Sequence, residues 1–220
     1  MVDRMDNPTK KLIRETATRL FREKSFENVT LNDICRASGV NKHTFYYYYK
    51  SKDDLLKHYY FFPWHLSAAE ATAILTSDNC MEQIWLLVQK YIDYVNTAGV
   101  QIVRQILIKN LTEDVGTFRV GDEMKEILRL EYTIIKKGQE RGQFRNKANP
   151  MVLAILMIQV MYSNGLLWAI FQGDFNAEKC IRFFLENLFD VEDSYRTTSE
   201  KDFKSFSSLF PDFKKEDFQS

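Results

Sequence analysis

The side chains best suited to chemistry in this 220-residue chain lie in one short segment. It opens with Lys42 and His43 and ends in four consecutive tyrosines, 46–49. Lysine, histidine and tyrosine donate hydrogen bonds to phosphate oxygens and to base edges. Because four consecutive side chains point to all sides of a helix, these tyrosines cannot share one core face. We expect Phe45 and Tyr49, which are four residues apart, to be buried and the other side chains to face a partner.

The residues before this segment carry the signals of two short helices. Thr30 precedes an apolar pattern, and Asp33 follows it at the spacing of a capping box. Gly39 is suited to the left-handed position that ends a helix, and Asn41 is a good N-cap for a second helix over 42–48. Two helices joined by such a turn form a helix-turn-helix, whose second helix enters the DNA major groove. The segment therefore predicts DNA recognition.

Two more predicted helices bracket this pair. Asn7 is a suitable N-cap for a helix that begins at Pro8 and runs to about Lys24. Another begins after Ser51 and extends over 51–76. Pro63 lies inside the second one and cannot donate a backbone hydrogen bond, so we expect a kink or an interruption there. We interpret this proline either as a joint that transmits an effector signal or as a simple break between two helices.

A set of residues at fixed spacing makes this region resemble the tetracycline-repressor (TetR) family of transcriptional regulators. The matching residues are Thr30, Ile34, Ala37, Gly39, Val40, Thr44, Phe45, Tyr46, Lys50, Ser51, Lys52, Leu55 and Leu56. The resemblance covers about the first quarter of the chain directly. It implies a homodimer with an N-terminal three-helix DNA-binding module and a helical C-terminal domain for effector binding and dimerisation.

The resemblance also implies which residues contact DNA. Tyr46 and Lys52 would bind phosphates, and Lys42, His43, Thr44 and Tyr47 would lie at or near the groove. With Tyr48 as a further phosphate donor, the predicted DNA-binding set is Thr30, Lys42, His43, Thr44, Tyr46, Tyr47, Tyr48 and Lys52. The chain departs from the family pattern at His43, Tyr48 and Tyr49, which affects the operator sequence and leaves the fold unchanged.

Charge is distributed unevenly although the formal net charge is zero. Residues 1–58 carry 12 lysines and arginines against 8 acidic residues, whereas residues 59–220 carry 18 against 22. The positive part contains the motif, which suits a polyanionic partner.

The rest of the chain shows helical periodicity, which predicts an all-α fold. We expect helices near 80–97, 100–111, 121–141, 150–172 and 176–189. The predicted domains are a helix-turn-helix DNA-binding domain at 1–55, a helical bundle for ligand binding and dimerisation at 56–190, and a C-terminal tail at 191–220. Phenylalanines in that tail predict either a short amphipathic helix as far as Pro211 that packs on its own or the partner subunit, or a mobile tail that docks elsewhere.

The apolar run 151–170 has the length of a membrane span, but polar residues interrupt it and no basic cluster flanks it. We predict a buried helix and no membrane partner. A second helix places Ile181, Phe184, Leu185 and Leu188 on one apolar face. The resemblance implies that these two helices form half of a four-helix dimer interface.

Effector chemistry is less explicit in the sequence. Aromatic and methionine side chains of the C-terminal part are numerous enough for an apolar pocket, although most of them are explained by ordinary core packing. The candidates for effector binding are Trp64, Trp85, Tyr132 and Trp168.

Other classes of protein fit poorly. The chain has no glycine-rich phosphate loop and no nucleophile elbow, and its histidines and three cysteines are not spaced as metal ligands. We expect no enzyme activity, cofactor or metal, and the dispersed cysteines favour a reducing cytoplasm. The leading hypothesis is a repressor released from a palindromic operator by a small-molecule effector. The alternative is a DNA-binding activator or repressor controlled by a partner protein.

Overall fold

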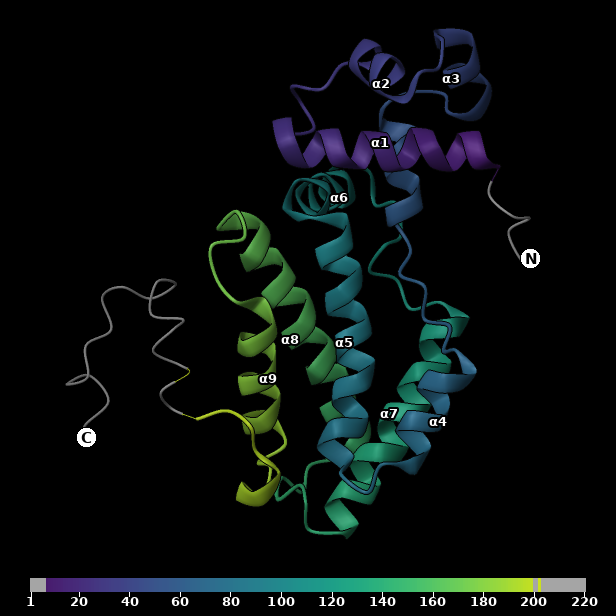
Figure 1. Cartoon of the computed structure of the whole chain (residues 1–220). Helices are drawn as coiled ribbons and strands as arrows, with labels where there is room; N and C mark the ends of the chain where they lie inside the picture. The colour runs from purple at the N-terminus through teal and green to yellow at the C-terminus, as the bar shows by residue number, and fades with distance from the viewer. Residues whose placement is uncertain (1–6, 200–201, 203–220) are drawn as a thin grey trace, which may run out of the picture. The chain divides into compact units, whose positions relative to one another are not determined.

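The computed structural model describes residues 7–199 and residue 202, and within them the fold is all-α (Figure 1). One isolated bridge, Phe144 to Val191, is the β pairing found in this part of the chain. The elements in order are α1 (Pro8–Lys24), α2 (Leu31–Ser38), α3 (Lys42–Tyr48), η1 (Asp53–Tyr59), α4 (Ala68–Thr76), α5 (Cys80–Ala98), α6 (Val100–Glu113), α7 (Asp122–Glu140), α8 (Pro150–Ile170), α9 (Ala177–Leu188) and η2 (Asp193–Tyr195). The predicted fold class is confirmed.

The chain forms two compact units, and each takes residues from separate parts of the sequence. Among the described residues, the first unit contains 7–62 and 94–119, and the second contains 63–93, 120–199 and residue 202. Residues 203–220, for which a short amphipathic helix was predicted, lie outside the described part of the chain.

The first unit is built from locally specified helices. Thr30 and Asp33 form the predicted capping box at the start of α2, and Gly39 ends that helix in the left-handed conformation with a φ of 70°. The Asn41 side chain accepts from a backbone N–H of the first turn of α3. Helix α2 packs against α1 and against α3 (Figure 1), and buried apolar side chains including Phe21, Ile34 and Phe45 fill the space between them.

The segment predicted as helix over 51–76 is interrupted around Pro63, as expected, although the prediction of helix along the rest of it is wrong. The chain forms a 3₁₀ turn at Asp53–Tyr59, leaves helical structure, and starts α4 only at Ala68. Pro63 explains the break, because proline lacks the N–H that a helix interior needs and disfavours helical geometry in the residue before it. Ser67 and Glu70 then start α4 with a capping box of their own.

The second unit is a helical bundle in which α8 packs against α7 and α9. Its core contains apolar side chains from α5, α7, α8 and α9, among them Ile84, Ile135, Met157 and Leu185. Helix α8 is long and apolar enough to cross a membrane by length and composition, and 44% of its most apolar window is buried inside the structure. One such helix is weak support for a membrane span, since core helices satisfy the same criteria.

Candidate functional site

The inner face of α3 is anchored by two aromatic residues. Phe45 is fully buried, and Tyr49 directly after the helix is also buried. The Tyr49 hydroxyl donates to the carbonyl oxygen of Lys10 on α1 at 3.1 Å, which supplies the partner that a buried phenol requires. Both side chains were expected in the core, and together they set the orientation of α3 on α1.

The outer face of α3 is exposed and rich in hydrogen-bond donors. Tyr46 is 56% exposed and Tyr47 is 78% exposed, which is unusual for side chains of this size. Lys42 and His43 at the start of the helix are exposed as well. Tyr48 is half-buried, with its ring edge-on to that of Tyr47 at a centroid distance of 4.9 Å. A partner that approaches this face therefore meets an ammonium, an imidazole and phenolic hydroxyls.

Thr30 acts at the start of α2, the first helix of the pair. Its hydroxyl accepts from the backbone N–H of Asp33 at 3.2 Å, and the Asp33 carboxylate accepts from both the hydroxyl and the backbone N–H of Thr30. These hydrogen bonds hold the pKa of Asp33 below its usual range, with a smaller contribution from Arg36. The side chain of Thr30 is thus already engaged in the cap, although the residue is exposed.

The side chain of Lys52 forms hydrogen bonds within the first unit. Its ammonium donates to the carbonyl oxygens of Phe26 at 2.7 Å and Val29 at 2.9 Å, and it lies 4.3 Å from the centre of the Phe26 ring. This side chain ties the loop between α1 and α2 to the start of η1.

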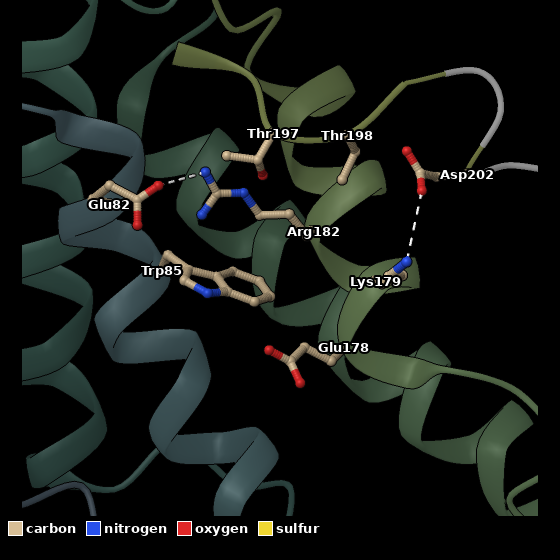
Figure 2. A pocket seen from close by; sticks show the side chains of 8 residues that line it. All are labelled: Glu82, Trp85, Glu178, Lys179, Arg182, Thr197, Thr198 and Asp202. Carbon is tan, nitrogen blue, oxygen red and sulfur yellow. Dashed lines mark hydrogen bonds and ion pairs between the residues drawn. The ribbon is translucent and has the colours of Figure 1, made fainter.

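Of the effector candidates, Trp85 lines the surface pocket found in the second unit. A surface pocket of about 290 Å³ in the second unit is lined by Trp85 and by seven polar residues, which are Glu82, Glu178, Lys179, Arg182, Thr197, Thr198 and Asp202 (Figure 2). Trp64, Tyr132 and Trp168 are half-buried and do not line it.

The charges of this pocket are largely paired with one another. Figure 2 shows Arg182 reaching toward Glu82, to which it is bonded at 2.7 Å, and its guanidinium lies 5.0 Å from the centre of the Trp85 ring. Lys179 pairs with Asp202 at 3.9 Å. These two pairs involve four of the five charged residues that line the pocket, and the fifth is Glu178.

Sequence reasoning missed two buried polar residues in the second unit, Glu131 on α7 and Asn164 on α8. Glu131 occupies a core position of α7, because Ile127 and Ile134 lie on the same buried face four residues before it and three residues after it. An acidic residue inside an apolar stripe was the signal that could have revealed it.

Metal chemistry finds no support in the described residues, which contain no group of three or more potential ligands from His, Cys, Asp and Glu. The three cysteines are free and buried.

Residues 13–59 match the family model described as bacterial regulatory proteins, tetR family. The N-terminal region is of the TetR family. This region includes the helix-turn-helix pair and η1. A comparison with curated proteins found no match.

Solved structures of TetR-family regulators have the same fold over most of the chain. The fatty acid degradation regulator FadR from Bacillus halodurans is 17% identical with a TM-score of 0.57, covering 84% of this chain and 97% of that one. A TetR-family regulator from Cytophaga hutchinsonii is 17% identical with a TM-score of 0.56, at 88% and 99% coverage. The TetR-family repressor FadR from Thermus thermophilus, in complex with lauroyl-CoA, is 20% identical with a TM-score of 0.50, at 81% and 92% coverage. At these identities the likeness establishes the fold.

Proposed function

We propose that this chain is a sequence-specific transcriptional repressor that binds a palindromic operator as a homodimer and is released by a small-molecule effector. The observation that carries the proposal is the two-sided character of α3. Its inner face is anchored by Phe45 and Tyr49, whereas its outer face exposes large hydrogen-bonding side chains that packing does not explain. We assign DNA recognition to residues 1–55, and effector binding and dimerisation to residues 56–190. The protein would act in the cytoplasm.

In this proposal the residues at the N-terminus of α3 read base edges, as in other recognition helices. Lys42, His43 and Thr44 would have this role together with Tyr47. Tyr46 and Tyr48 would donate to phosphates, and Thr30 and Lys52 would support or extend the phosphate contacts.

An exposed apolar surface on α8 and α9 supports dimerisation. Helix α8 exposes large apolar side chains along its length, and α9 adds a phenylalanine; the exposed residues are Val152, Ile155, Leu156, Leu166, Ile170 and Phe184. A surface of this kind on a soluble regulator marks an interaction site. In a two-fold dimer it would pair with its own copy, so that two recognition helices contact half-sites about one DNA turn apart.

Small-molecule control is supported by the Thermus FadR structure, which shares the fold and is described as a complex with lauroyl-CoA. Control by a partner protein is the second candidate. It is favoured by the lining of the surface pocket beside Trp85, because seven of its eight residues are polar whereas small-molecule sites are lined mainly by apolar side chains.

The proposal is tested by in vitro selection of random DNA duplexes with the purified full chain, beside Tyr46→Phe and Lys42→Ala variants. We expect enrichment of a palindrome. The Tyr46→Phe variant, which loses a phosphate contact, should bind all sequences more weakly, and the Lys42→Ala variant, which loses a base-edge contact, should bind the palindrome more weakly and with relaxed base preference. Lys136→Ala, which removes an exposed lysine from α7, is the matched control and should bind like the wild type. Absence of any enriched duplex would refute the proposal.

A further inference from the structure

The core of the second unit contains two polar atoms that the fold does not use. Glu131 is 2% exposed and Asn164 is 3% exposed. Among the described residues, the Oε2 atom of Glu131 and the Oδ1 atom of Asn164 are buried and have no hydrogen-bond partner. Each unpaired acceptor costs about 1–3 kcal/mol of folding free energy, so natural proteins rarely keep such atoms. Two in one core indicate a role other than folding.

Glu131 lies among apolar neighbours on the buried face of α7, which also carries Ile127, Ile134 and Ile135. Burial away from water raises the pKa of Glu131 to about 8. The carboxyl group is therefore mostly protonated and uncharged at neutral pH. It becomes a carboxylate when an opposite charge is placed beside it.

Two tyrosines on other helices belong to the same cluster. Burial raises the pKa of Tyr162 on α8, and the nearby Glu131 raises it further. Tyr91 on α5 has its pKa raised by burial and, to a smaller extent, by Tyr162. Helices α5, α7 and α8 thus each contribute a polar group to one apolar region.

Close packing holds the Tyr91 hydroxyl against α8. The hydroxyl donates a long hydrogen bond of 3.4 Å to the carbonyl oxygen of Met161. A Cβ atom at Gly165 would lie only 2.7 Å from the Tyr91 oxygen, so glycine at this position makes room for the hydroxyl. The amide of Asn164, next to this glycine, interacts with the Cys180 thiol on α9. Its oxygen is left for another donor.

We propose that Glu131, beside Tyr162 and Tyr91, forms the recognition point for an effector that carries a protonated amine on an apolar body. This inference rests on the proposed control by a small molecule. Once Glu131 has lost its proton, its carboxylate only accepts hydrogen bonds, so a ligand that complements this form must supply donors. A cation gains from the carboxylate and from tyrosine rings, whereas an anion would be repelled by the carboxylate.

Binding of such an amine would be linked to release of a proton. In the free protein Glu131 holds its proton below a pKa of about 8, and the ammonium group binds the carboxylate form. Affinity should therefore rise with pH, by about tenfold per unit well below that pKa, and level off above it. The titratable groups that face Glu131 are Tyr162 from α8 and, beside it, Tyr91 from α5. Their raised pKa values keep both neutral over this range.

The test is titration calorimetry of the full chain without DNA, using n-alkylamines from hexyl to dodecyl below micelle-forming concentrations. Alkanols and alkanoates of the same lengths are the ligand controls. We expect the amines to bind in preference to both, and Glu131→Gln to weaken amine binding at least about tenfold at pH 8. Glu126→Gln, which removes an exposed carboxylate from the same helix, is the matched control and should bind like the wild type.

Three results would overturn the inference: no amine of the series binds, the alkanols or alkanoates bind equally well, or Glu131→Gln retains full affinity. If Glu131→Gln does not fold, the wild-type titration from pH 6 to pH 8 decides, and an affinity that is constant over this range counts against the inference. Since no DNA is present, these results do not affect the DNA-binding proposal. Failure of the duplex selection would likewise leave amine binding intact.

Discussion

Replacing Glu186 with alanine should destabilise the second unit strongly. Glu186 on α9 is fully buried, and its carboxylate accepts from the Nε atom of Arg182 at 2.6 Å. It also accepts from the backbone N–H groups and the hydroxyls of Thr197 and Thr198. The carboxylate thereby ties the segment after η2 to α9, and its partners Arg182, Thr197 and Thr198 line the pocket in Figure 2.

The expected loss of stability in Glu186→Ala follows from the buried donors that are left without an acceptor. Arg182 is 5% exposed and would keep only its bond to Glu82 among these contacts, while the donors of Thr197 and Thr198 lose their acceptor. Removing one partner of a buried ion pair costs about 3–5 kcal/mol. Against a total stability of about 5–15 kcal/mol this is a large fraction. Glu186→Gln keeps one oxygen as an acceptor and should cost less.

The assay is urea unfolding followed by circular dichroism at pH 7. Glu178→Ala, on the same helix and at the same pocket but exposed, is the matched control and should change the free energy of unfolding by less than about 0.5 kcal/mol. A loss below about 1 kcal/mol in Glu186→Ala would refute the reasoning, because it would mean that the buried arginine finds other partners at no cost.

The same residue predicts a pH dependence. Burial alone would raise the pKa of Glu186, but the hydrogen bonds from Thr198, Arg182 and Thr197 outweigh it and lower the pKa. A carboxyl group with a lowered pKa in the folded state stabilises the fold above its unfolded pKa, near 4.5. That contribution is lost as the pH falls through the folded pKa. The stability difference between wild type and Glu186→Gln should therefore shrink on acidification below about pH 4.5; a constant difference would contradict the assignment.

Three further changes test other contacts by urea unfolding. Gly165→Ala should lower the free energy of unfolding by about 1–3 kcal/mol, because the new methyl group clashes with the Tyr91 hydroxyl; about 1 kcal/mol of this is offset by the better helix propensity of alanine. Adding Tyr91→Phe to this variant removes the hydroxyl and should restore the lost stability. Tyr49→Phe should cost about 1 kcal/mol, since it removes a hydrogen bond to α1, and no loss would show that the hydroxyl is unimportant. Lys52→Met should lower the free energy of unfolding by about 2 kcal/mol, because it removes two hydrogen bonds to carbonyl oxygens. If stability is unchanged and the salt dependence of DNA binding instead falls by about 1, the main role of Lys52 is contact with phosphate.

The sequence by itself determined the local elements. The capping box of Thr30 and Asp33, the left-handed Gly39 and the N-cap Asn41 were predicted and confirmed, because each depends on backbone groups within a few residues. The five helices from α5 to α9 begin and end within two residues of their predicted limits. The burial of Phe45 and Tyr49 likewise follows from their spacing on one helix face.

Only the tertiary structure decided which polar side chains have hydrogen-bond partners and which do not. Helical periodicity placed Pro63 inside one helix, whereas the chain resumes helical structure only where Ser67 supplies a new cap. The contacts of Lys52 with carbonyl oxygens more than twenty residues away have no local signal. The same is true of the unpaired oxygen of Glu131, which depends on the packing of α7 against α8. Burial and pairing of a polar atom depend on residues distant in the chain, so they emerge only when helices pack together.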